Sequence, residues 1–82
     1  MLPVEIDRAS SVAPYRQIAG WLRSRIDSGE LGAGDRLPSA VDLAEQFGVA
    51  VLTGRKALGV LVDEGIAYRS IGMGTYIRRR EP

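Results

Sequence analysis

The feature that most constrains the fold is a two-residue break, Gly48-Val49, between two segments with helical spacing of apolar residues. Before the break, Leu43, Ala44 and Phe47 fall on one helical face. The longer segment after it, residues 50–64, has an apolar face made of Ala57, Leu58, Leu61 and Val62. A glycine in so short a connection lets two helices meet at a steep angle. The sequence therefore predicts two short helices joined by a tight turn.

A third amphipathic segment precedes this pair. Pro14 suits the first position of a helix, because its missing N–H costs nothing there. The residues that follow it on one face are Ile18, Ala19, Leu22 and Ile26. Gly29 is predicted to end this helix in a left-handed conformation. Trp21 lies beside the apolar stripe, where it either covers the edge of the core or forms an exposed dimer contact.

Capping residues predict where the second helix begins and ends. Ser39 is a favourable N-cap, and Asp42 three residues later completes a capping box with aspartate in the place of glutamate. Gly48 ends the helix after about two turns. Residues 36–38, just before the cap, are predicted to form a short strand.

The last part of the chain has the pattern of a hairpin. Residues 66–70 and 75–79 alternate in polarity like strands, and the glycine-rich segment 71–74 between them predicts a turn. A three-helix bundle explains the helices but not these strands, so we expect a mainly α winged helix-turn-helix with a two-to-three-stranded wing sheet. The expected organisation is an extended N-terminal arm, one folded domain and a basic tail over residues 1–13, 14–78 and 79–82.

Composition excludes several classes of protein. A chain of 82 residues without cysteine or histidine is expected to form one domain with no disulfide, no thiol chemistry and no usual zinc site. We expect no cofactor, no metal and no enzymatic activity, since the acidic pair Asp63-Glu64 ends a helix and faces no substrate site. The N-terminus lacks a signal-peptide core, and no apolar run approaches the roughly 18 residues of a membrane helix. These features lead us to expect a cytoplasmic protein.

The charges are unevenly distributed although the net charge is only +1. Residues 1–48 carry five arginines against seven acidic residues, whereas residues 49–80 carry six basic residues against two acidic ones. The second half is therefore the basic half, and this asymmetry favours a polyanionic partner.

Four segments in order resemble the DNA-binding domain of the GntR-type (gluconate-repressor-like) bacterial transcriptional regulators. They are PYRQIAGWLRSRIDSGEL, GDRLPSAVDLAEQFGV, TGRKALGVLVDEGI and GMGTYI, which together cover residues 14–77. The resemblance implies a homodimeric regulator, a repressor or an activator, that binds palindromic operator DNA at the nucleoid. Helix 50–64 then enters the major groove, and the wing at 71–76 touches the minor groove or the backbone. Because the chain ends where the family's effector domain begins, no small-molecule effector is implied.

The resemblance also implies a set of DNA-binding residues. Arg55 is expected to read a base, while the hydroxyl and basic groups contact phosphates and the wing glycines allow close approach. The full set is Ser39, Thr53, Arg55, Lys56, Arg69, Gly72, Met73, Gly74, Thr75 and Arg78. The alternatives are a solvated charged face for the basic residues and a local backbone hydrogen bond for Thr53.

The family pattern is broken at the positions that usually carry its polar DNA contacts. Ala40 and Val41 stand where the family has Glu-Arg, and Ala50 and Val51 stand where it has Ser-Arg. Val41, Ala50, Val51 and Leu52 form a possible apolar contact patch. Its residues either touch thymine methyl groups or make the chain a protein-interaction module, for dimerisation or regulator binding, that has lost specific DNA binding.

Two glycines, Gly54 and Gly59, fall inside the predicted third helix. Each costs about 1 kcal/mol relative to alanine in a helix interior. Either a close helix contact or a need for flexibility explains them, and the sequence leaves both explanations open.

Overall fold

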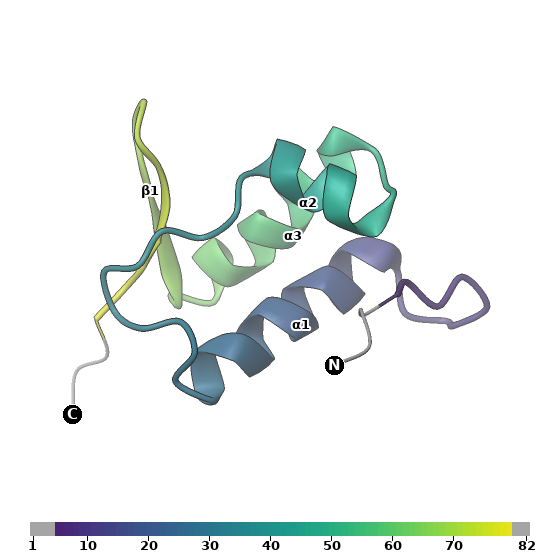
Figure 1. Cartoon of the computed structure of the whole chain (residues 1–82), viewed down its shortest axis with the longest axis horizontal. Coiled ribbons are helices and arrows are strands. Elements are labelled where there is room, and N and C mark those ends of the chain that lie inside the picture. Colours follow the sequence, from purple (N-terminus) through teal and green to yellow (C-terminus); the bar gives the residue numbers. More distant parts are fainter. Residues whose placement is uncertain (1–4, 80–82) are drawn as a thin grey trace.

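The computed structural model describes residues 5–79, which form three helices and a two-stranded antiparallel sheet. In chain order the elements are α1 (Pro14–Asp27), α2 (Ala40–Phe47), α3 (Val51–Asp63), β1 (Ala67–Ser70) and β2 (Gly74–Ile77). In Figure 1, α1 and α3 lie side by side, α2 packs near the start of α3, and the hairpin stands at one end of the molecule. The winged helix-turn-helix predicted from the sequence is therefore confirmed.

The predicted helix ends agree closely with the observed ones. Ser39 Oγ accepts a hydrogen bond from the Asp42 N–H at 3.0 Å, and Asp42 Oδ2 accepts from the Ser39 N–H at 3.1 Å, which is the capping box. Gly48 ends α2 with φ of 66°, and Gly29 follows α1 with φ of 85°. These glycines adopt the left-handed conformation at low cost because they lack a Cβ.

The approach of α2 to α3 depends on Gly54. A Cβ atom at this position would lie 2.6 Å from the carbonyl oxygen of Ala40, the first residue of α2. A Cβ at Gly59 would meet only the Arg69 guanidinium, at 3.5 Å, which is an ordinary contact distance. Gly54 is therefore explained by a close helix contact, and that explanation does not extend to Gly59.

The wing is a single hairpin in which Ala67 pairs with Ile77 at its base. The strand predicted at residues 36–38 is reduced to one isolated bridge, between Arg36 and Tyr76. Past this bridge the Leu37 N–H donates to the Thr75 carbonyl at 2.8 Å, and the chain then enters the Ser39 cap of α2, so no third strand forms here. The sheet therefore has two strands, the lower number of the predicted range.

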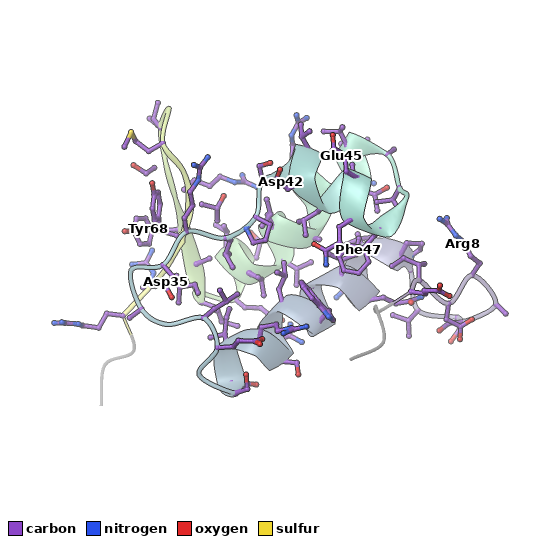
Figure 2. The ribbon with its side chains drawn as sticks, viewed as in Figure 1. Arg8, Asp35, Asp42, Glu45, Phe47 and Tyr68 are labelled. Atoms are coloured by element: carbon purple, nitrogen blue, oxygen red, sulfur yellow. The ribbon has the colours of Figure 1, made fainter. Side chains whose placement is uncertain are left out.

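The segment 5–13, the described part of the predicted N-terminal arm, is a turn-containing loop; residues 1–4 of that arm and 80–82 of the predicted basic tail lie outside the described residues. The Gln17 side chain holds it, since Nε2 donates to the carbonyls of Asp7 and Val12 at 2.9 and 2.8 Å. Oε1 of the same side chain accepts from the Asp7 N–H at 2.8 Å. Arg8, labelled in Figure 2, then donates to the carbonyl of Gly48 at 3.1 Å. The loop is thus fixed to α1 and to the turn between α2 and α3.

The core lies between the three helices and the inner face of the hairpin. Its largest fully buried side chains are Ile18, Leu22, Leu37, Leu43 and Leu61. Trp21 packs edge to face on Phe47 with ring centroids 5.3 Å apart, and the Arg25 guanidinium lies 4.6 Å from the centre of its ring. Trp21 therefore covers the edge of the core, the first of its two predicted roles. Among residues 5–79, none of the helices is long and apolar enough to cross a membrane.

Candidate nucleic-acid interface

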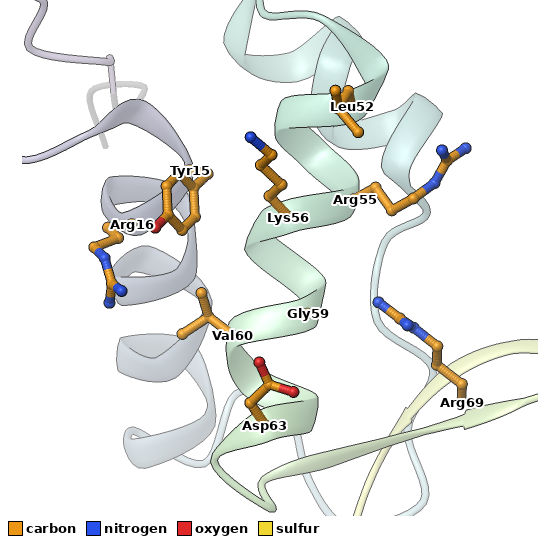
Figure 3. Close-up of a pocket in the computed structure, with 9 residues that line it drawn as sticks. All are labelled: Tyr15, Arg16, Leu52, Arg55, Lys56, Gly59, Val60, Asp63 and Arg69. Carbon is orange, nitrogen blue, oxygen red and sulfur yellow. The ribbon is translucent and has the colours of Figure 1, made fainter.

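One face of α3 lines an open hollow between α1 and the wing. The lining residues of α3 follow helical spacing, because residues three and four apart lie on the same side of a helix. We name this site the basic hollow; it is lined by Tyr15, Arg16, Leu52, Arg55, Lys56, Gly59, Val60, Asp63 and Arg69, and its volume is about 420 Å³. Figure 3 shows that α1, α3 and β1 each contribute side chains to it.

The basic hollow carries four cationic side chains against a single carboxylate, that of Asp63. Arg55 and Lys56 come from α3, and both are exposed. Within residues 5–79, Arg23 pairs with Glu64 and Arg25 with Glu30, whereas neither Arg55 nor Lys56 is in an ion pair. Arg55 and Lys56 therefore lie on one exposed surface, and their contact with DNA stays a prediction.

Tyr15 connects α1 to this surface. The Arg16 guanidinium lies 5.3 Å from the centre of the Tyr15 ring, and Lys56 Nζ lies 6.0 Å from it. Both distances are within the range of cation–π attraction, so the ring helps to hold the two cations above the hollow. The sequence did not single out Tyr15 and Arg16 as site residues, because neither is part of the apolar stripe of Ile18, Leu22 and Ile26. The packing of α1 beside α3 brings them into the site.

Arg69 and Arg78, both predicted to bind DNA, lie on different sides of the hairpin. Arg69 pairs with Thr75 and its guanidinium reaches over Gly59 of α3, where no side chain blocks it. Arg78 follows β2 with its guanidinium 5.6 Å from the ring centre of Tyr68, which lies on the opposite face of the sheet. Only Arg69 therefore belongs to the basic hollow.

Thr75, a predicted DNA-binding residue, has a structural role in the hairpin, and its contact with DNA stays a prediction. Its side chain is only 9% exposed, because it faces inward on the same side of the hairpin as Ile77. Its carbonyl oxygen accepts a hydrogen bond from the Leu37 N–H at 2.8 Å. Thr75 thus joins the wing to the segment before α2 and presents little surface to a ligand.

The wing tip is exposed and apolar. The Met73 side chain is 60% exposed, and Ile71 beside it is fully exposed. Gly72 and Gly74 have φ values of 75° and 123°, which only glycine adopts readily. A Cβ at Gly74 would lie 2.7 Å from Nε of Arg36, so this arginine packs across the wing where a side chain would not fit. Sequence reasoning missed Arg36, whose position depends on a contact between distant parts of the chain.

Ser39 is the N-cap of α2 and Thr53 lies in the first turn of α3, and the two hydroxyl groups differ in the hydrogen bonds they already make. Ser39 Oγ is already an acceptor in the capping box of α2, although its hydroxyl proton remains able to donate. Within the described residues, the half-buried Thr53 side chain makes no hydrogen bond to protein, so the local bond considered above does not form. A phosphate contact by either hydroxyl stays a prediction.

Comparison with known proteins identifies this arrangement. The model of the family described as bacterial regulatory proteins, gntR family, matches residues 14–77, more than half of the chain. The chain belongs to the GntR family. It is a GntR-type DNA-binding domain of the kind found in transcriptional regulators.

Individual GntR relatives support the assignment. The HTH-type transcriptional repressor NagR of Bacillus subtilis is 41% identical over 93% of this chain and 31% of its own length. The mannosyl-D-glycerate transport/metabolism system repressor MngR of Escherichia coli is 45% identical over 78% of this chain and 27% of its own length. The chain therefore spans less than a third of these two relatives.

Solved structures agree in fold. YtrA from Sulfolobus acidocaldarius, a GntR-family transcription factor, superposes with a TM-score of 0.80 and 39% identity over 96% of this chain and 66% of its own. The DNA-binding domain of AraR in complex with operator ORX1 superposes with a TM-score of 0.79 and 33% identity, over 87% of this chain and 88% of its own. The second structure shows the fold bound to operator DNA.

Within this GntR fold, the start of α3 is exposed and apolar. The side chains of Val41, Val51 and Leu52 are 52%, 39% and 55% exposed, and Ala50 is exposed as well. Ala50 is the N-cap of α3 and supplies no side-chain hydrogen bond, as the break in the family pattern predicts. The residues of the apolar patch are therefore at the surface, as expected from the sequence.

Proposed function

We propose that this chain binds operator DNA with α3 in the major groove and the wing against the neighbouring groove or backbone. The observation that carries the proposal is the basic hollow, where four cations from α1, α3 and β1 face outward with one carboxylate among them. A surface of this kind attracts the phosphate backbone, whose charge dominates the affinity of proteins for DNA. The likeness to the AraR domain, which was solved in complex with operator DNA, supports operator DNA as the partner.

We assign some of the basic residues to phosphate contacts and one to a base contact. Lys56, Arg69 and Arg16 lie around the rim of the hollow and are assigned to phosphates, which position a protein on the duplex without reading sequence. Arg55 lies one turn into α3, and we assign it to a base edge, where the preferred partner of arginine is guanine. Arg36 beside the wing is a further candidate for the backbone.

We further propose that two copies bind a palindromic operator and regulate transcription in the bacterial cytoplasm. One domain of this size offers few phosphate contacts, whereas two copies on half-sites one helical turn apart double them. NagR and MngR are both named repressors, which makes repression the favoured direction of control for this chain.

The test begins with selection of a duplex from a randomised library by the purified protein. Arg55→Ala is expected to weaken binding of the selected duplex by about 1–3 kcal/mol and to relax specificity at one base pair. The matched control is Arg79→Ala, which removes the same charge from an exposed residue outside the basic hollow. Equal loss in the two variants would show that only net charge matters and would contradict the assigned site.

The exposed apolar patch favours a second candidate, a protein-interaction module. Under this candidate Val51 and Leu52 are covered by a second copy or by another regulator, since an exposed apolar patch often marks a protein interface. Val51→Arg separates the two candidates. It disrupts association in sedimentation measurements if the patch is a protein contact, and it strengthens DNA binding, by adding a cation beside the polyanionic duplex, if the patch faces DNA.

A further inference from the structure

The first turn of α3 has no side chain that can form a hydrogen bond until Thr53 is reached. Ala50, Val51 and Leu52 begin the helix, and both larger side chains are well exposed. In the proposed complex this turn enters the major groove first, because the start of a recognition helix lies nearest the bases. The residues closest to the bases therefore offer methyl groups in place of donors and acceptors.

Helix geometry places these methyl groups on the proposed DNA-facing surface. Leu52 precedes Arg55 and Lys56 by three and four residues, and all three line the basic hollow (Figure 3). Val51 precedes Gly54 by three residues, so it lies toward the side of α3 that meets the start of α2. Val41 is the second residue of α2 and extends the same apolar surface.

The surrounding charge indicates what covers this surface. Leu52 shares the basic hollow with four cationic side chains and one carboxylate. A protein partner would have to bury or neutralise those cations, whereas a duplex pairs them with phosphates while its bases approach the apolar side chains. The charge pattern therefore favours DNA as the occupant.

We propose that the chain reads its operator through the C5-methyl groups of pyrimidines, with Val51 and Leu52 as the specificity-determining residues. This inference rests on the proposed function and adds to it the chemical class of base that is recognised. In the major groove thymine presents a C5-methyl group and cytosine does not. An apolar side chain responds to the methyl group and not to the exocyclic oxygen or amine, so 5-methylcytosine should be accepted in the place of thymine.

The experiment compares four versions of one selected duplex. The substitutions are made at each position where the selected duplexes share one pyrimidine. Two versions carry thymine or uracil opposite adenine, and the other two carry 5-methylcytosine or cytosine opposite guanine. Kd is measured by fluorescence anisotropy at constant salt. We expect each contacted methyl group to strengthen binding about fourfold, both for thymine over uracil and for 5-methylcytosine over cytosine.

Variants of the protein assign the effect to the two side chains. In Leu52→Ala and in Val51→Ala, the ratio of Kd for the uracil duplex to Kd for the thymine duplex is expected to fall toward one. Each variant should lose this preference at a different position of the duplex. Val12→Ala is the control, because Val12 is 46% exposed and lies in the loop before α1, outside the basic hollow. Circular dichroism confirms that each variant folds, which is expected for substitutions at exposed positions.

Three results overturn the inference in different ways. Specific binding with equal Kd for thymine and uracil at every position contradicts methyl reading and leaves operator binding intact. Failure to select any preferred duplex contradicts operator binding itself. If Leu52→Ala instead abolishes self-association without changing the uracil-to-thymine ratio of Kd, the surface is a protein contact and the inference is wrong.

Discussion

Replacing Gly54 by alanine adds a methyl group where the first turn of α2 meets α3. The new Cβ would lie 2.6 Å from the Ala40 carbonyl oxygen and 3.2 Å from the Ala40 Cα. Both are backbone atoms and cannot rotate away, so the helices must move apart by about 0.8 Å to reach an ordinary contact distance of 3.4 Å. This movement opens the packing between α2 and α3.

The magnitude follows from two opposing terms. Alanine is favoured over glycine in a helix interior by about 1 kcal/mol, and overpacking of a tight contact costs about 1–3 kcal/mol. We expect Gly54→Ala to lower the free energy of unfolding by about 1 kcal/mol. Gly59→Ala is the matched control in the same helix, because its Cβ meets only a flexible guanidinium at 3.5 Å. It should raise the free energy of unfolding by about 1 kcal/mol.

Urea unfolding followed by the fluorescence of Trp21, the single tryptophan, measures both variants. Trp21 packs on Phe47 of α2, so its emission reports the packing of that helix. The two variants should differ by about 2 kcal/mol, which corresponds to ~8–16 °C in Tm for a domain of this size. If Gly54→Ala and Gly59→Ala stabilise the protein equally, the close contact with Ala40 does not exist.

Three further predictions concern caps and charges. Ser39→Ala should lower the free energy of unfolding by about 1 kcal/mol through loss of the capping box, as measured in urea. Ala50→Ser should raise it by ~1 kcal/mol, because α3 begins without a side-chain cap; an unchanged midpoint would show that the cap does not form. Arg69→Ala should weaken binding of a selected duplex and reduce the log–log salt slope by the value expected for one phosphate contact, about 0.9. Arg78→Ala, on the other face of the wing, should change neither quantity.

The helices and their ends were predictable because the signals that set them are local. Ser39 and Asp42 are three residues apart, and each satisfies a backbone group of the other. Gly48 is placed by its own conformational freedom, which no other residue shares. The position of Arg55 on α3 follows from periodicity alone. For these residues, the neighbours in sequence determine the local structure.

The remaining features depend on contacts between distant parts of the chain. Gln17 holds the loop at 5–13 through hydrogen bonds to Asp7 and Val12, and no local sequence signal predicts these bonds. Arg69 reaches α3 because the pairing of β1 turns it inward, whereas Arg78 faces the other way. Strand alternation alone could not assign the two arginines to faces before the register was known.

The most direct test of operator binding is fluorescence anisotropy of the wild-type protein on a selected duplex and a scrambled duplex across a salt series. We expect a preference of about 10³ or more for the selected duplex. We also expect a log–log salt slope of about −2.7 per bound copy, from Lys56, Arg69 and Arg16, the three cations of the basic hollow assigned to phosphates. Equal affinity for both duplexes, or binding that does not change with salt, would contradict operator binding.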